Sequence, residues 1–349
     1  MRWLTCLAVV LVSTALLGCG GDTPEPAFAR GPYLVRVTTD SAKLRWISRD
    51  PSAEVRVHAS PETGGLPTRA VDGLFTGLAS NTRYNWTATE GDREASGSFV
   101  TAPRRLEGTL TFVVFGDHGT GGPDQRAVAR VAEAQDPRML LTTGDNSYLA
   151  ATPDLLDPNL FEPLRGLQAR APNLGVVGDH DIVFELGRRA LVDALEWPGD
   201  GDRFDVDYGP VQFIGIGLRG EADDRAHLAR ALRRRGPEVR FLLVHQPLKA
   251  GNPLLPVIER SGLAAVLSGH LHAYERRSVD GAASVPQFTV GTGGASASSF
   301  GTPRSDDAAV HLREFGLLRM DVRRGGVHYR FLDTTGTVRD ELVTGTVTE

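Results

Sequence analysis

Five short runs of apolar residues, each four or five residues long, limit the possible folds of this chain more than any other feature. They lie at residues 111–115, 139–143, 174–177, 241–244 and 264–267. Nearly continuous apolar runs, whose only polar residues here are Thr111, Thr142 and Thr143, are typical of strands buried on both faces of a parallel sheet. Between the runs, apolar residues repeat at helical spacing after Pro123 and after Asp223. This order of strands and helices predicts an α/β architecture.

The residues that directly follow these runs are the candidates for a site, because ligands of open α/β sheets bind beyond the carboxyl ends of the strands. Asp117, Asp145 and Asp179 each follow a run and a glycine, and His245 directly follows the fourth run. The fifth run leads into Gly269-His270-Leu271-His272. A glycine at such a position lets the backbone turn sharply off the strand and direct the next side chain over the sheet edge.

Together these residues predict a metal site. Three carboxylates and three imidazoles at one sheet edge would repel and desolvate one another unless cations held them together. Oxygen and nitrogen ligands without sulfur suit iron, manganese or zinc. One Gly-Asp pair alone is a weak signal, because the chain contains seven and several lie in plain turns. The five motifs in this order are far more specific than any one of them.

The order of the motifs resembles that of the calcineurin-like metallophosphoesterases, and among them the purple acid phosphatases. The resemblance rests on Gly116-Asp117-His118-Gly119, Gly144-Asp145 with Tyr148, Gly178-Asp179-His180-Asp181, His245-Gln246-Pro247 and residues 269–276. It implies an α/β domain of two facing sheets flanked by helices. It also implies a dinuclear metal centre and hydrolysis of phosphate monoesters by attack of a metal-activated water.

Carried over position by position, the resemblance implies that each ion has three ligands of its own and that Asp145 bridges the two. Asp117, Tyr148 and His272 would hold the first ion, and Asp179, His245 and His270 the second. The implied pair is iron with iron, zinc or manganese, since a phenolate on a ferric ion colours the purple enzymes. His180 would be a catalytic residue that contacts the phosphate or protonates the leaving group. His118 is a second candidate, either catalytic or orienting a ligand.

Two positions depart from the family pattern. Asp179 stands where the family usually has asparagine, which adds one negative charge to the ligand set. The loop at residues 248–255 lacks the further histidine that plant and animal members place near the substrate. We therefore expect protonation of the leaving group to rest on His180.

Upstream of the α/β region, residues 31–103 show the alternation of apolar and polar residues that is typical of strands. Val55 and Val57 share one face of such a run, and Tyr84 and Trp86 share one face of another. Turn-rich clusters separate the runs at the spacing of a small β-sandwich. The segment resembles the fibronectin-III-like domain that precedes some secreted phosphatases. We predict this domain over residues 31–103 and a catalytic domain over residues 107–349.

The first residues have the features of an export signal: one early arginine, an apolar stretch too short to span a bilayer comfortably, and small residues after it. A buried N-terminal helix is the alternative, but polar, turn-rich residues follow immediately. Leu16-Leu17-Gly18-Cys19 resembles a bacterial lipobox, in which Cys19 would carry the lipid. We predict a signal peptide over residues 1–18, a tether over 19–30, and a membrane-anchored lipoprotein in the periplasm or on the cell surface.

The net charge and the positions of the cysteines argue against some classes of partner and metal ligand. The net charge of −5 argues against a nucleic-acid binder that neutralises phosphates. Both cysteines, Cys6 and Cys19, lie in the first 19 residues, so no thiol ligand is expected in the folded part. The expected partner is a small phosphate ester, and the oligomeric state stays open. Two alternatives also stay open: a phosphodiesterase or nucleotidase of the same superfamily, and a non-catalytic surface-binding lipoprotein with a vestigial site.

Overall fold

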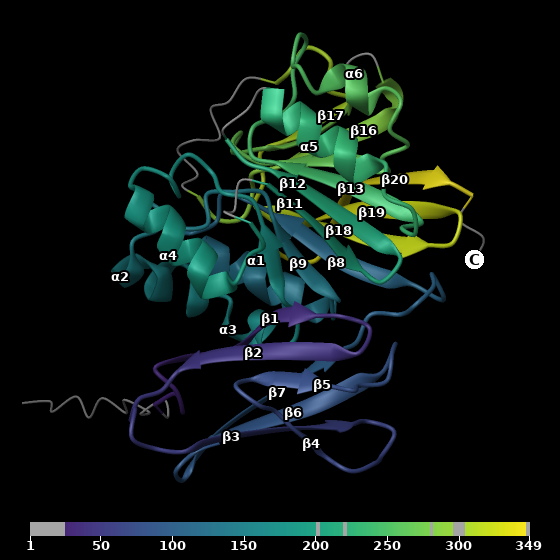
Figure 1. Ribbon diagram of the computed structural model, residues 1–349. Coiled ribbons are helices and arrows are strands. Elements are labelled where there is room, and N and C mark those ends of the chain that lie inside the picture. The colour runs from purple at the N-terminus through teal and green to yellow at the C-terminus, as the bar shows by residue number, and fades with distance from the viewer. Residues whose placement is uncertain (1–24, 200–202, 219–221, 280–281, 296–303, 347–349) are drawn as a thin grey trace, which may run out of the picture.

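The computed structural model describes residues 25–199, 203–218, 222–279, 282–295 and 304–346 (Figure 1). The predicted signal peptide, Cys6, Cys19 and the first part of the predicted tether, residues 19–24, lie outside these ranges. None of the helices within the ranges has the length and apolar character needed to cross a lipid bilayer. The described residues form four β-sheets with helices around the two larger ones.

The regular elements of residues 30–100 are all β-strands, and they form two antiparallel sheets. The first contains, in the order β1-β2-β5, the strands β1 (Arg30–Val37), β2 (Ser41–Ile47) and β5 (Leu74–Thr76). The second contains, in the order β4-β3-β6-β7, the strands β3 (Val55–Pro61), β4 (Thr68–Arg69), β6 (Arg83–Glu90) and β7 (Arg93–Val100). In β6, Tyr84 and Trp86 are buried and Asn85 between them is exposed, as the alternation predicts. The region agrees with the predicted all-β domain, while its fibronectin-III likeness and the boundaries stay predictions.

The remaining strands form two larger sheets. The six-stranded sheet has the order β10-β9-β8-β18-β19-β20, with β8 (Leu110–Phe115), β9 (Met139–Thr142), β10 (Asn173–Gly175), β18 (Gly316–Arg323), β19 (Gly326–Asp333) and β20 (Val338–Gly345). The seven-stranded sheet has the order β11-β12-β13-β14-β16-β15-β17, with β11 (Arg203–Tyr208), β12 (Val211–Ile216), β13 (Val239–Val244), β14 (Ala265–Ser268), β15 (Tyr274–Val279), β16 (Ala282–Val290) and β17 (Val310–Leu312).

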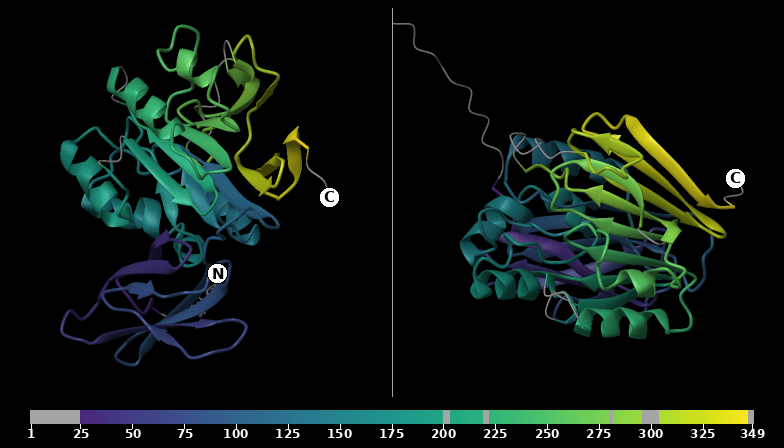
Figure 2. Two further views of the ribbon diagram at one scale, coloured as in Figure 1. Left: turned by 45° about the vertical axis from the view of Figure 1, so that its right-hand side comes forward. Right: turned by 90° about the horizontal axis from the view of Figure 1, so that it is seen from above.

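The two larger sheets lie face to face (Figure 2). Aromatic side chains pack between them. The ring of Phe112 on β8 lies 5.1 Å from that of Phe213 on β12, and the ring of Phe288 on β16 lies 4.6 Å from that of Tyr329 on β19. All four residues are fully buried. Burial of aromatic side chains between two sheets is a large stabilising contribution. The predicted architecture of two facing sheets is confirmed.

The five predicted apolar runs form β8, β9, β10, β13 and β14. Parallel pairing joins β8 to β9, β9 to β10, and β13 to β14, in keeping with their continuous burial. The antiparallel strands β18, β19 and β20 were not predicted. In β20, intermediate and exposed residues alternate, so this edge strand has no continuous apolar run that could mark it in the sequence.

Helices cover the outer faces of the two sheets (Figure 2). The described helices are α1 (Pro123–Ala134), α2 (Pro153–Leu156), the π-helical turn η1 (Asp157–Phe161), α3 (Arg165–Gln168), α4 (Glu185–Leu195), α5 (Ala222–Leu232) and α6 (Leu255–Ile258). The two predicted helices are α1 and α5. Val128, Ala129 and Ala132 of α1 are buried, which matches the predicted spacing of its apolar face.

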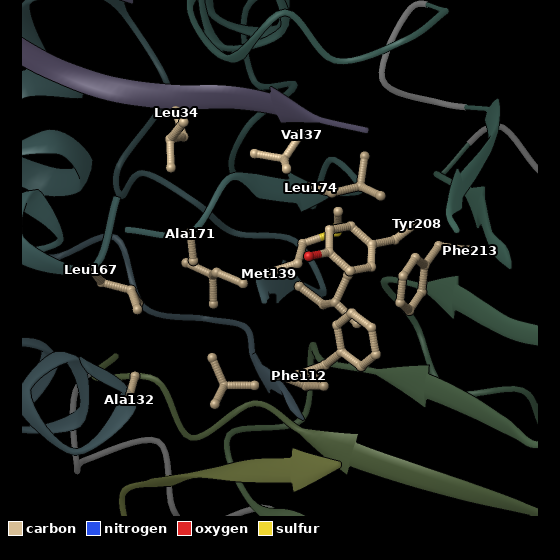
Figure 3. Packing of buried hydrophobic residues seen from close by; sticks show 14 of the residues in the cluster. Leu34, Val37, Phe112, Ala132, Met139, Leu167, Ala171, Leu174, Tyr208 and Phe213 are labelled. Atoms are coloured by element: carbon tan, nitrogen blue, oxygen red, sulfur yellow. The ribbon is translucent and has the colours of Figure 1, made fainter. Parts of the chain in front are cut away.

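The N-terminal β-region shares a hydrophobic core with the α/β region (Figure 3). Leu34 and Val37 of β1 lie opposite Ala171, Leu174 and Met139, and all five are buried. Hydrogen bonds cross the same boundary, from Tyr33 Oη to Ala194 O (2.8 Å), Trp86 Nε1 to Ala169 O (3.0 Å) and Tyr208 Oη to Val100 O (2.7 Å). Apolar side chains are buried and hydrogen bonds are formed across this boundary. The N-terminal β-region therefore packs directly against the α/β region.

Shortening Leu34 tests this shared core. Leu34→Ala removes buried methyl groups between the two regions, so we expect the free energy of unfolding to fall by about 2–5 kcal/mol. The measurement is urea unfolding followed by intrinsic fluorescence. Leu66→Ala is the control, because Leu66 is 90% exposed, and its effect should stay within about 0.5 kcal/mol. Equal effects of the two changes would contradict the packing described.

Candidate metal centre

Loops from both larger sheets bring the seven predicted ligands into contact. Asp117, Asp145 and Asp179 follow β8, β9 and β10 of the six-stranded sheet, and Tyr148 lies in the loop after Asp145. The histidines come from the seven-stranded sheet: His245 follows β13, and His270 and His272 follow β14. Since the two sheets face each other with these strand ends at one edge, residues far apart in sequence meet there.

Tyr148, Asp117 and His272 form one side of the cluster. The Tyr148 hydroxyl donates a hydrogen bond to Asp145 Oδ2 (2.9 Å) and lies 3.0 Å from His272 Nε2. His272 Nε2 also lies 3.3 Å from Asp117 Oδ1. The sequence separation of these contacts reaches 155 residues, from Asp117 to His272, so the fold alone creates this arrangement.

Asp179, His245 and His270 form the other side. Asp179 Oδ1 lies 2.7 Å from His245 Nε2 and 3.1 Å from His270 Nδ1. The opposite nitrogen of His245, Nδ1, lies 2.8 Å from the carbonyl oxygen of Thr143. Because a carbonyl oxygen only accepts, Nδ1 carries the proton, and Nε2 is the atom that faces the carboxylates.

Asp145 lies between the two sides. Its Oδ2 accepts from Tyr148, while its Oδ1 lies 3.7 Å from His245 Nε2 and accepts from the backbone N–H of His180 (3.0 Å). One carboxylate therefore presents one oxygen to each half of the cluster. This is the placement that a ligand bridging two cations requires.

Three of the clustered residues have left-handed backbone conformations. The φ angles of Asp117, Asp145 and His270 are 55°, 52° and 66°. This conformation is uncommon for residues other than glycine, although aspartate, asparagine and histidine adopt it more often than most. It costs on the order of 1 kcal/mol or more per residue and persists where the surrounding structure imposes it. Three of the seven non-glycine residues with a positive φ angle in the described part of the chain belong to the cluster.

Glycines before the clustered residues leave space for them. The four glycines are Gly116, Gly144, Gly178 and Gly269. Of the four, Gly144 has a positive φ angle (102°), which favours glycine there. A Cβ on Gly178 would lie 2.1 Å from Asp145 Oδ1, and a Cβ on Gly144 would lie 2.3 Å from His245 Nδ1. A larger residue at either position would push the candidate ligands apart.

Burial shifts the pKa values of Asp145 and Tyr148 upward. Burial raises the pKa of Asp145, and the negative charge of Asp117 raises it further. Burial, together with the charges of Asp117 and Asp145, raises the pKa of Tyr148 far above its usual range. Without a cation, the phenol therefore keeps its proton. A bound cation favours the phenolate instead, since it reverses the sign of the local field.

His245 and Asp179 balance each other in charge. Burial lowers the pKa of His245, but the hydrogen bond to Asp179 and the charges of Asp117 and Asp145 outweigh it and raise that pKa to about 9. The hydrogen bond from His245 in turn holds the pKa of Asp179 well below its usual range. A proton on this imidazole is thus the positive charge that offsets the buried carboxylates.

The donor set fits metal ions. Three groups of residues each place one ligand atom per residue within 4.8 Å of the others: Asp179, His245 and His270; Asp117, Asp145 and His245; and Asp145, Asp179 and His180. The donors are carboxylate oxygens and imidazole nitrogens, which suit zinc, manganese or iron. Asp145, Asp179 and His245 each belong to two of the groups, so the three groups form one connected cluster of candidate metal ligands.

The two histidines predicted as catalytic lie in different surroundings. His180 is half-buried, and its ring lies 4.4 Å from the ring of Tyr148. His118 is fully buried, packs edge-on against Phe115, and has no hydrogen-bond partner for either ring nitrogen among the described residues. Burial lowers the pKa of His118 to about 4, despite the nearby charge of Asp117. A catalytic role by direct contact with a substrate does not fit His118, whereas His180 is accessible.

Asp181 is a buried residue beside the cluster, and the sequence predicted no role for it. Its buried carboxylate accepts hydrogen bonds from the backbone N–H of Gly178 (2.8 Å), Asn146 (2.9 Å) and Ser147 (3.1 Å) and from Asn146 Nδ2 (2.8 Å). These bonds tie the loop after β9 to the loop after β10. Burial and the charge of Asp145 raise the pKa of Asp181 to about 7. Its place at the end of Gly178-Asp179-His180-Asp181 was the available signal.

Comparison with known proteins agrees with this architecture. Residues 110–274 match the family of calcineurin-like phosphoesterases, which assigns this part of the chain to a calcineurin-like metallophosphoesterase domain. The match contains Asp117, Asp145, Tyr148, Asp179 and His245 and extends past His270 and His272. A search among curated proteins gave no significant match.

Solved structures show the same fold. The purple acid phosphatase PPD1 from yellow lupin (Lupinus luteus) seeds superimposes with a TM-score of 0.73 at 15% identity, over 91% of this chain and 75% of that one. PhoD gives 0.63 at 14% identity, over 92% and 90%. GAP50, the anchor in the inner membrane complex of Plasmodium, gives 0.53 at 13% identity, over 70% and 90%. At such identities the likeness establishes the metallophosphoesterase fold.

Removing Asp145 should lower the metal content of the site. In Asp145→Ala neither half of the cluster keeps its shared oxygen, so we expect the purified protein to lose at least one of two bound ions. The measurement is metal analysis by mass spectrometry after gel filtration. Asp92→Ala is the matched control, because Asp92 belongs to another Gly-Asp pair, in the exposed turn between β6 and β7. Full metal content in Asp145→Ala would contradict the bridging placement.

Restoring the usual residue of the family at Asp179 should leave metal binding intact. Asp179→Asn keeps an oxygen at the position of Oδ1, next to His245 and His270, and removes one negative charge. We expect the variant to retain both ions, measured in the same way as for Asp145→Ala. Loss of an ion in Asp179→Asn would argue against Asp179 as a ligand through that oxygen.

Proposed function

We propose that the protein hydrolyses phosphate monoesters at a centre of two metal ions. The observation that carries this proposal is the position of Asp145, whose two oxygens face the two halves of the cluster within a metallophosphoesterase fold. A fold match alone would not support an activity, because one fold hosts many functions. Here the polar groups at the carboxyl ends of the strands also have the composition that the chemistry needs.

The residues on each side of Asp145 would hold the ions. Asp117, Tyr148 and His272 would hold one ion, and Asp179, His245 and His270 the other. When bound, such a pair lowers the pKa of a water molecule and neutralises charge on the phosphate. The Thr143 carbonyl contributes by fixing the tautomer of His245, and Asp181 contributes by holding the two aspartate loops together.

His180 supplies the proton for the leaving group. In the reaction, a water oxygen forms a bond to phosphorus, and the bond from phosphorus to the ester oxygen breaks. The departing alcohol oxygen takes a proton from the protonated ring of His180, and the proton that the attacking water loses restores His180. The products are the alcohol and inorganic phosphate. His180 suits this role because its backbone N–H is bound to Asp145 while its ring stays accessible.

Iron is the proposed metal on the tyrosine side. The Tyr148 hydroxyl lies within 3.0 Å of both Asp145 Oδ2 and His272 Nε2, so a phenolate oxygen would share an ion with them. Ferric phenolates absorb in the middle of the visible range. A colourless protein that contains two ions would instead favour zinc or manganese at this position.

The proposed location rests on the sequence. The apolar N-terminal stretch and Leu16-Leu17-Gly18-Cys19 support an exported lipoprotein with its lipid on Cys19. The proposed partner is a small phosphate ester outside the cytoplasm. Metabolic labelling with a fatty acid, compared between the full chain and Cys19→Ala, tests the anchor.

Activity assays separate the proposed function from its alternatives. We expect the purified protein to hydrolyse p-nitrophenyl phosphate faster than bis-p-nitrophenyl phosphate. His180→Ala should lower kcat about 10²- to 10⁴-fold on alkyl phosphates, and less on p-nitrophenyl phosphate, whose leaving group needs little protonation. Metal content should not change. His58→Ala is the control, since His58 is exposed on β3, far along the chain from the cluster.

Each other outcome has a definite meaning. Faster hydrolysis of the diester would favour the phosphodiesterase alternative. A protein with two bound ions and no turnover on any phosphate ester would favour a non-catalytic surface protein. GAP50, described as an anchor, belongs to the structures that share this fold, so the fold itself is not restricted to one use.

A further inference from the structure

A cavity of about 390 Å³ lies directly beside the candidate metal centre. One wall is His270, whose Nδ1 lies 3.1 Å from Asp179 Oδ1, and other walls include Gln246, Lys249 and Asn252. We propose that this cavity selects substrates whose alcohol part carries a second anionic group, and that Lys249 binds that group. The inference rests on the proposed function, because it assigns the leaving-group side of the same site.

Lys249 is a free cation at the mouth of the site. It is exposed, and its ammonium group has no hydrogen-bond or ion-pair partner in the part of the chain that the structure describes. The chain contains 38 basic residues, of which only Lys43 and Lys249 are lysines. Lys43 is paired with Glu196 at 2.6 Å. Lys249 is thus the lysine left available for a ligand.

The backbone before Lys249 is held in place by buried side chains. The backbone N–H of Leu248 donates to Gln287 Oε1 (3.0 Å), and the carbonyl of Leu248 accepts a hydrogen bond from Arg277. Leu248, Gln287 and Arg277 are all buried. The Lys249 carbonyl then accepts from the backbone N–H of Asn252 (3.0 Å), which closes a turn. The backbone position of Lys249 is therefore set by the fold, so that only its side chain has to be ordered on binding.

The positive charge of Lys249 indicates that the cavity binds an anionic group. Lys249 is the only lysine, arginine, aspartate or glutamate among the described residues that line the cavity. The amides of Gln246 and Asn252 add polar groups without charge. In the proposed binding mode, the alcohol part of a phosphate held by the metal ligands would lie beside His270, which lines the cavity. A carboxylate or second phosphate on that alcohol would meet a cation there.

The available space allows an alcohol of several carbon atoms. A second cavity of about 350 Å³ shares Gln246 and Asn252 with the first, so the two adjoin. Sites for small organic ligands typically have volumes of about 300–1,000 Å³. The pair of cavities falls within this range. The metal ligands would bind the phosphate of the ester, and the cavity that contains Lys249 would bind its alcohol part.

A matched pair of substrates tests the inference. In 2-phosphoglycerate the ester stands on the same carbon as in glycerol 2-phosphate, but a carboxylate replaces one hydroxymethyl group. The quantity compared is kcat/KM for 2-phosphoglycerate divided by kcat/KM for glycerol 2-phosphate. We expect Lys249→Met to lower this ratio about fivefold, mainly through a higher KM for 2-phosphoglycerate. This is the effect expected for loss of a partly exposed ion pair. Lys249→Arg should keep most of the ratio, and added salt should lower it in the native protein but not in Lys249→Met.

The other lysine is the control. Lys43→Met removes a positive charge from the N-terminal β-region and should leave the ratio unchanged. An unchanged ratio in Lys249→Met, with normal hydrolysis of p-nitrophenyl phosphate, would overturn this inference and leave the proposed function standing. Absence of hydrolysis of any phosphate ester by the native protein would overturn both.

Discussion

Buried negative charge at the carboxyl ends of the strands is the constraint around which this structure is organised. The carboxylates of Asp117 and Asp145 are shielded from water and share the neighbourhood of one phenol, Tyr148. An uncompensated buried charge costs several kcal/mol, and removing one partner of such a pair is strongly destabilising. In the polypeptide alone, the imidazolium of His245 offsets part of the cost. A pair of cations would offset it more fully, which links metal binding to the stability of the fold.

The rest of the architecture serves to hold these groups together. Each sheet contributes part of the cluster, and aromatic packing such as that of Phe112 against Phe213 keeps the sheets at a fixed separation. Glycine at Gly144 and Gly178 allows the side chains to approach at contact distance. The carboxylate of Asp181 gathers four donors from two loops, so the loops that carry Asp145 and Asp179 cannot shift independently. Precise placement of the groups that act on a substrate needs such supporting contacts.

The sequence predicted the parts of the structure that produce a pattern of apolar and polar residues along a continuous stretch of chain. Strands buried on both faces must be apolar throughout, so β8, β9, β13 and β14 were visible, and the polar residues after them marked the cluster. Patterns that depend on partners in space were not visible. The burial of His118 depends on how the loop after β8 packs, and the packing of Leu34 against the α/β region depends on the whole fold. The role of Lys249 needed the cavity, because a lone lysine in a loop has no sequence signal.

The left-handed backbone at Asp117, Asp145 and His270 has a consequence for how such a centre can change over time. β-Branched and bulky residues are excluded from that conformation by their own Cβ contacts, whichever chemistry is selected. The side chains that tolerate it best after glycine are aspartate, asparagine and histidine, which are also donors to metal ions. Backbone conformation and metal coordination therefore favour nearly the same few residue types at these three positions. Substitutions there cost the backbone least when one such donor replaces another, or when glycine replaces it and the metal ligand is lost.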